Sequence, residues 1–100
     1  MEASGIEVVG EAADADGAIS LARQERPDIC LMDVAVPGAS GIDAAIRVRA
    51  AASGTRVVML AARLDEKLVV AALDAGACGY LLKDSSGDQI VDAIHAVAGG

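Results

Sequence analysis

Aromatic side chains are almost absent from this sequence. Tyr80 is the only one among 100 residues, and there is no Phe or Trp. Any core must therefore be aliphatic, and a hydrophobic content of 54% supplies enough material for one domain of this length. Apolar runs are short as well. None approaches the roughly 18 residues that a membrane-spanning helix needs, and no signal peptide is visible, so we expect a soluble, cytoplasmic domain.

Basic residues and cysteines are also scarce. Eight Lys and Arg stand against fifteen Asp and Glu, and the formal net charge is −7. Because such a surface repels phosphate groups, we expect no direct nucleic-acid binding and no membrane partner. The two cysteines, Cys30 and Cys78, lie in apolar, strand-like runs without C-x-x-C spacing or a nearby His. This pattern predicts reduced, buried thiols and argues against a disulfide or a metal site.

Short apolar runs alternate with helical periods along the whole chain. Asp14 and Ser40 are typical residues for capping a helix, and Pro27 blocks the continuation of the first helical segment. The alternation of strands and helices with short connections predicts an α/β domain with a parallel sheet and right-handed crossovers. The predicted strands cover residues 6–12, 29–33, 56–61 and 78–82, and the predicted helices cover residues 14–25, 40–53, 65–75 and 86–99.

The segment around Asp33 carries the first chemical signal. The apolar run 29–32 ends at this acid, and Pro37, Gly38 and Gly41 follow it closely. A short apolar run that stops at turn residues is typical of a strand buried on both faces. The carboxylate of Asp33 is therefore expected at the carboxyl end of a central strand, which is where ligands and chemistry are found in open α/β sheets.

Three motifs together resemble a response-regulator receiver domain, most closely one that precedes a helix-turn-helix effector. They are LMDVAVPGASG at 31–41, VVMLAA at 57–62 and AGACGYLLKD at 75–84, and the resemblance extends through essentially the whole chain. It implies a flavodoxin-like, three-layer sandwich with a parallel sheet. It also implies two-component signalling, in which a histidine kinase donates a phosphoryl group and the output is transcription through an effector domain.

The resemblance assigns roles to single residues. Asp33 matches the phosphoacceptor, and Lys83 matches the lysine that pairs with the acceptor and its phosphoryl oxygens. Tyr80 matches the aromatic residue whose ring turns inward on activation, and Ala35 would offer a backbone carbonyl to the Mg²⁺ expected for the family. The alternatives for the first three positions are a solvated acid, an ordinary surface lysine and a half-buried tyrosine.

Two departures from the family pattern affect these expectations. Ala61 stands where the family has a hydroxyl residue that hydrogen-bonds the phosphoryl group, and alanine has no donor. The family's first strand, with its pair of Mg²⁺-binding acids, and most of its first helix have no counterpart here. We therefore interpret residues 1–100 as an N-terminally truncated receiver, in which Asp33 alone makes a poor Mg²⁺ site. Phosphotransfer should be slow and its readout impaired.

The missing first strand also leaves the expected strand at 6–12 without its neighbour. Either this strand pairs directly with 29–33, or another chain fills the gap, or the sequence is a fragment of a longer product. We expect a repaired or shared sheet in a homodimer.

Other functional classes fit the residues less well. A phosphatase of the dehalogenase type needs a second Asp two residues after the nucleophile, where this chain has Ala35. Flavodoxin-like and cobalamin-binding modules need phosphate-loop or D-x-H-x-x-G motifs that are not found here. We therefore expect no enzyme activity. The remaining alternative is a degenerate, phosphorylation-independent receiver that acts as a dimerisation module through residues 65–75, the strand to Leu82 and the last helix.

Overall fold

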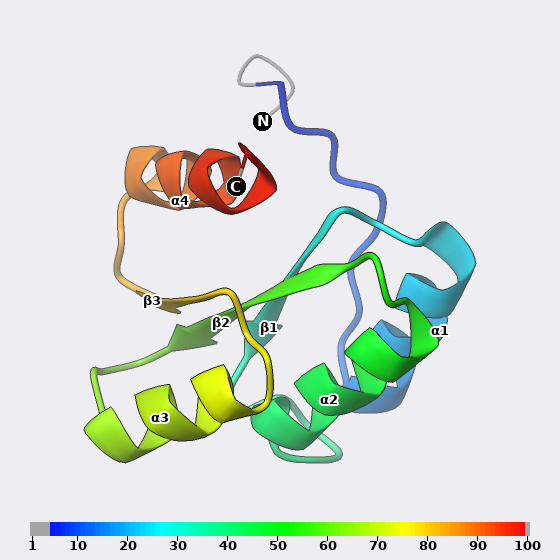
Figure 1. Cartoon of the computed structure of the whole chain (residues 1–100), viewed down its shortest axis with the longest axis horizontal. Helices are drawn as coiled ribbons and strands as arrows, with labels where there is room; N and C mark the ends of the chain where they lie inside the picture. The colour runs from blue at the N-terminus through cyan, green and yellow to red at the C-terminus, as the bar shows by residue number, and fades with distance from the viewer. Residues whose placement is uncertain (1–4, 100) are drawn as a thin grey trace.

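A computed structural model describes residues 5–99 of the chain (Figure 1). Four helices alternate with three strands. No helix in this described range is long and apolar enough to cross a membrane. The elements in chain order are α1 (Ala15–Glu25), β1 (Ile29–Asp33), α2 (Gly41–Ala51), β2 (Arg56–Ala61), α3 (Glu66–Asp74), β3 (Gly79–Leu82) and α4 (Gly87–Gly99).

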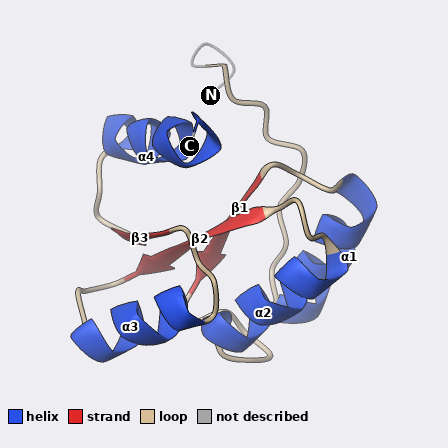
Figure 2. Ribbon diagram, viewed as in Figure 1, coloured by secondary structure: helices blue, strands red, loops and turns tan. Residues whose placement is uncertain are grey.

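The strands form a parallel sheet in the order β1-β2-β3. The helices α1, α2 and α3 cover one face of the sheet, and α4 covers the other (Figures 1 and 2). The register pairs Asp33 with Leu60 and Leu60 with Leu81, so the three strands end at the same edge of the sheet. The α/β class and the parallel sheet predicted from the alternating pattern are confirmed.

Polar side chains fix the helix starts, and the predicted capping residues are confirmed. The Asp14 carboxylate accepts a hydrogen bond from the backbone N–H of Gly17 at 2.7 Å, and the Ser40 hydroxyl accepts one from Asp43 at 3.0 Å. These bonds satisfy N–H groups that have no partner inside the helix. At the start of α4, Ser86 and Gln89 form a reciprocal capping box, and Ser86 is one of the three caps that the sequence offers there, with Asp84 and Ser85.

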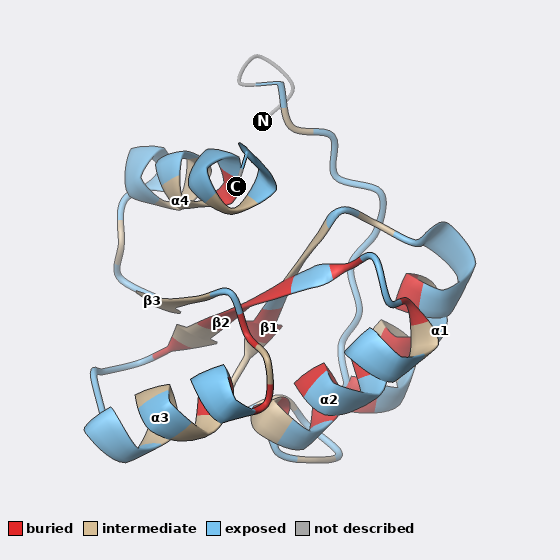
Figure 3. Ribbon diagram, viewed as in Figure 1, coloured by how far each residue is buried: buried red, intermediate tan, exposed pale blue. Residues whose placement is uncertain are grey.

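The core is built from small aliphatic side chains on both sides of β2. Val57, Val58 and Met59 on this central strand have no exposed surface (Figure 3). Gly41 allows α2 to begin directly beneath the end of β1, because a Cβ atom there would lie only 2.2 Å from the carbonyl oxygen of Asp33. The guanidinium of Arg56 donates to the carbonyl oxygens of Val97 and, at 3.4 Å, Ala98, which ties the end of α4 to β2.

The predicted strand at 6–12 is wrong. These residues carry no regular secondary structure and do not pair with β1, and the side chains of Val8 and Val9 are 60% and 45% exposed. An extended apolar segment becomes a strand only when a neighbour satisfies its backbone groups, and no strand in the described range pairs with this segment. β1 is therefore an edge strand, and the sheet is not repaired within the chain. The prediction that the strand ending at Asp33 is central and buried on both faces is wrong, since only Met32 of its residues is buried.

The prediction for the cysteines is only half right. Both thiols are free of disulfides, and burial raises the pKa of the Cys30 thiol. Cys78 is exposed, however, because β3 begins one residue later, at Gly79, and forms the outer edge of the sheet.

The burial pattern predicts unequal effects of truncating two apolar side chains. Met59→Ala should lower the free energy of unfolding by about 3 kcal/mol, because it leaves a cavity in the centre of the sheet. Val8→Ala should change it by less than about 0.5 kcal/mol, because the side chain is already largely hydrated. Urea denaturation of both variants measures the difference. A large loss for Val8→Ala would show that residues 6–12 are packed in solution.

Candidate functional site

The candidate site lies at the carboxyl edge of the sheet, where the ends of the three strands meet. Asp33 is the last residue of β1 and Ala61 the last of β2. The backbone N–H of Lys83 donates to the carbonyl oxygen of Ala61 at 2.8 Å, and that of Val34 donates to Leu60 at 2.9 Å. These two bonds extend the ladder past the strand ends and hold Asp33 and Lys83 on either side of β2.

The central feature of the site is an ion pair between Asp33 and Lys83. Lys83 Nζ lies 2.5 Å from Oδ2 of Asp33, while the backbone N–H of Ala35 donates to Oδ1 at 2.8 Å. The side chain of Asp33 is 37% exposed and that of Lys83 is 45% exposed. The carboxylate is thus held in one orientation but stays accessible to a partner that approaches from solvent.

The ion pair also sets the charge of the acid. The hydrogen bond from Lys83 lowers the pKa of the Asp33 carboxyl group, and the Ala35 N–H and the charge of Lys83 act in the same direction. Partial burial acts in the opposite direction but does not prevail. Asp33 is therefore fully ionised at neutral pH, which is the state in which a carboxylate acts as a nucleophile.

The two predicted switch positions, Ala61 and Tyr80, take no direct part in this ion pair. Ala61 is 1% exposed and presents only a methyl group, so it cannot donate a hydrogen bond at the strand end. Tyr80 on β3 is half-buried and packs against the core. Its hydroxyl lies 3.5 Å from the carbonyl oxygen of Arg63, which is at the outer limit of a hydrogen bond, in the loop between β2 and α3.

The residues present do not fit a Mg²⁺ ion. Both oxygens of Asp33 already accept hydrogen bonds, and residues 5–99 contain no group of three or more His, Cys, Asp or Glu side chains that could hold a metal. Mg²⁺ requires near-octahedral oxygen coordination, usually with one or two carboxylates. The backbone of Ala35 is beside Asp33 as expected, but the bond it makes there is a donated N–H.

The structure adds one contact that the sequence argument missed. The Ala35 N–H bond is an Asx-type turn, in which an Asp side chain accepts from the backbone two residues later. The signal was present in the sequence, since Asp33 precedes a loop rich in turn residues. The sequence did not indicate that one carboxylate oxygen of Asp33 accepts from its own loop while the other contacts Lys83.

An α/β domain with an ionised acid at the end of one parallel strand and a lysine just beyond the end of another is the arrangement that the resemblance to receiver domains implies. Residues 1–95 match the response regulator receiver domain family. The chain belongs to this family.

The chain is similar to several transcriptional regulators and receiver structures. It is 45% identical over 93 residues to the uncharacterized transcriptional regulatory protein YxjL of Bacillus subtilis, covering 93% of this chain and 43% of that protein. The solved receiver domain of the putative response regulator NarL of Mycobacterium tuberculosis is 40% identical, with a TM-score of 0.91, over 99% of this chain and 81% of that chain.

A second solved structure shares the fold. The response regulator of Burkholderia pseudomallei has a TM-score of 0.84 at 24% identity, over 98% of this chain and 57% of that chain, and it contains a phosphorylated aspartic acid, a calcium ion and citrate. The flavodoxin-like receiver fold is confirmed. Receiver domains of such regulators are not enzymes. The chain spans less than half the length of the curated relatives it matches.

The ion pair predicts an unusual titration of Asp33. Its carboxyl carbon, followed by NMR, should titrate below the usual value of about 3.9. Lys83→Ala should raise the midpoint toward that value, whereas Lys67→Ala, which removes the same charge from α3, should leave it unchanged. A lowered pKa stabilises the fold above the unfolded pKa, and this contribution is lost as the pH falls through the folded pKa. Equal midpoints in all three proteins would contradict the pairing.

Proposed function

We propose that residues 1–100 act as a cytoplasmic receiver unit of two-component signalling, in which Asp33 accepts a phosphoryl group from the phosphohistidine of a histidine kinase. The output would be transcription, through an effector domain, as the names of the relatives suggest. The observation that carries this proposal is the ion pair between the ionised Asp33 and Lys83 at an accessible strand end.

The transfer needs an in-line attack by a carboxylate. In the proposed step, an oxygen of Asp33 bonds to phosphorus while the phosphorus–nitrogen bond breaks, and the imidazole nitrogen leaves with the electron pair. Lys83 would then exchange its contact with the carboxylate for one with the phosphoryl oxygens and neutralise their charge. The Ala35 N–H keeps the second carboxylate oxygen fixed, so the Asp33 side chain samples fewer orientations before the attack.

Surface shape supports a macromolecular donor. Asp33 lies on an open edge, and the hollows identified on the described surface lie elsewhere: one is over α3, and the other is lined by Asp28, Gly54, Arg56 and Ala98. A small substrate is normally enclosed on most sides. An open acid suits a donor histidine that another protein carries.

Phosphorylation can be tested by intact-mass measurement after incubation with acetyl phosphate and Mg²⁺. We expect the added mass of one phosphoryl group, no addition in Asp33→Asn, and an undiminished addition in the matched control Asp28→Asn, which changes an acid near the opposite end of β1. Because residues 5–99 contain no group of three or more His, Cys, Asp or Glu side chains that could hold a metal, the addition should depend little on Mg²⁺. Labelling that persists in Asp33→Asn would refute the assignment of the acceptor.

A second candidate function is a receiver that works without phosphorylation. Ala61 favours it, because the strand end has no hydroxyl through which a phosphoryl group could be sensed. Histidine-kinase input would then be lost, and the domain would act through protein contacts alone. The same mass measurement separates the two functions, since an unmodified wild-type chain would support the second.

We also propose that the chain forms homodimers, whichever of the two functions applies. Among the surfaces that expose large apolar side chains, two could pair with a second copy: the free edge of β1, where Leu31 is 39% exposed, and the outer face of α3, where Val70 and Leu73 are 58% and 54% exposed. Sedimentation equilibrium should show an average mass that rises with concentration toward that of two chains. A mass that stays at one chain up to millimolar concentration would exclude self-association.

A further inference from the structure

The charge at the candidate site is balanced only while Asp33 is unmodified. In that state the ammonium of Lys83 pairs with the single negative charge of the carboxylate. A phosphoryl group carries a charge of about −1.5 to −2 at pH 7, so one ammonium does not neutralise it. The side chains of residues 5–99 include no group of three or more His, Cys, Asp or Glu that could hold a metal ion in that role. A phosphorylated Asp33 therefore needs a second positive side chain.

Arg63 is the residue placed to supply this charge. Three loops follow the strand ends at this edge of the sheet, and they cover residues 34–40, 62–65 and 83–86. Arg63 and Lys83 are the only cationic residues in these loops. The loop that carries Arg63 leaves the central strand β2, which lies between β1 and β3. Arg63 thus follows the strand that separates Asp33 from Lys83.

The chain keeps Arg63 close to the site. Arg63 comes two residues after Ala61, the last residue of β2, so their Cα atoms are at most about 7.6 Å apart. The same end of β2 contacts both sides of the site, because Leu60 accepts from the backbone N–H of Val34 and Ala61 accepts from that of Lys83, at 2.9 and 2.8 Å. The long, flexible side chain of Arg63 can therefore extend to oxygen atoms bound at Asp33.

The guanidinium of Arg63 is not committed elsewhere. Arg63 is exposed and forms no ion pair with any of residues 5–99. The nearest acid along the chain, Asp65, is engaged as the N-cap of α3, where its carboxylate accepts from the backbone N–H of Lys67 at 2.9 Å. The only side chain that contacts Arg63 by hydrogen bonding is Tyr80, whose hydroxyl lies 3.5 Å from the backbone carbonyl oxygen. This contact leaves the guanidinium unused.

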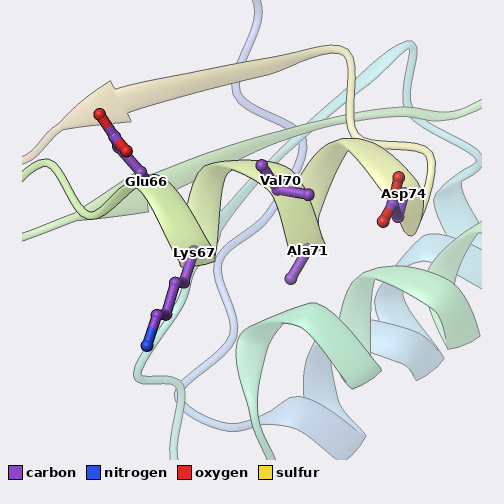
Figure 4. Close-up of a pocket in the computed structure, with 5 residues that line it drawn as sticks. All are labelled: Glu66, Lys67, Val70, Ala71 and Asp74. Carbon is purple, nitrogen blue, oxygen red and sulfur yellow. The ribbon is translucent and has the colours of Figure 1, made fainter.

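The next cation along the chain, Lys67, lies on the outer side of α3. It lines a hollow along that helix with Val70, Ala71 and Asp74 (Figure 4). These positions follow one another at helical spacing, away from the side of α3 that buries Ala72. Lys67 is thus a poor candidate for the second charge and a suitable control for Arg63.

We infer that the guanidinium of Arg63 binds the phosphoryl group on Asp33 together with Lys83, so that two side-chain cations stabilise it. This inference rests on the proposed phosphotransfer and names a further phosphoryl-binding residue for it. A planar guanidinium can donate two parallel hydrogen bonds to two phosphoryl oxygens. Because Lys83 already balances the resting carboxylate, the Arg63 contact forms as phosphoryl charge arrives, and a contact that strengthens in this way accelerates transfer.

The rate of labelling by acetyl phosphate tests this role. An oxygen of Asp33 bonds to phosphorus, the bond from phosphorus to the acetate oxygen breaks, and acetate leaves with the electron pair. With EDTA present, Arg63→Gln should slow the added mass about tenfold, whereas Arg63→Lys, which keeps the charge, should slow it only about threefold. Lys67→Gln should match the wild type. Equal rates in Arg63→Gln and the wild type, or wild-type labelling that requires Mg²⁺, would overturn the inference and leave Asp33 as the acceptor.

A binding measurement separates this inference from the transfer reaction itself. Asp33→Asn removes the charge that repels an anion and keeps both cations. We expect inorganic phosphate to bind this variant and to shift the side-chain NMR signals of Lys83 and Arg63. Adding Arg63→Gln should weaken binding about tenfold, and adding Lys67→Gln should not. If the wild type is never labelled but this difference is found, phosphotransfer is refuted and the anion-binding pair stands. A phosphate affinity that is insensitive to Arg63→Gln would refute the pair.

Discussion

The structure depends on the parallel register of the three strands. Because Asp33 aligns with Leu60, and Leu60 with Leu81, the residues at and just beyond the strand ends are brought to one edge. A shift of one residue would turn every side chain of a strand to the opposite face and separate Asp33 from Lys83. The fully buried Val57, Val58 and Met59 prevent such a shift, because both faces of β2 are packed. The geometry of the site is therefore fixed by the packing of buried aliphatic side chains on the central strand.

Much of this arrangement could be predicted from local sequence signals. Caps such as Asp14 and Ser40 marked helix starts, and the apolar run before Asp33 marked a strand that ends at this acid. The proximity of Asp33 to Lys83 followed from the rule that parallel strands end together. In each case the relevant physics acts within a few residues or follows from the topology alone.

The errors arose where structure depends on what lies beside a segment. Residues 6–12 have the composition of a strand, but a strand needs a neighbour, and composition does not report one. Cys78 lies in an apolar run of the sequence, yet its side chain is exposed, because it precedes the edge strand β3. The bond from Arg56 to the end of α4 joins residues more than forty positions apart, and no local pattern signals it. Long-range partners were invisible to the sequence argument, whether they were present or missing.

The scarcity of aromatic residues has a practical consequence. With no tryptophan in the sequence, Tyr80 is the only strong near-ultraviolet chromophore, and its hydroxyl lies beside the backbone of Arg63 in the loop that follows β2. Its absorbance and fluorescence consequently originate from a single place, near the edge of the sheet where the strands end. The chain carries its own spectroscopic probe of that loop, which needs no attached dye.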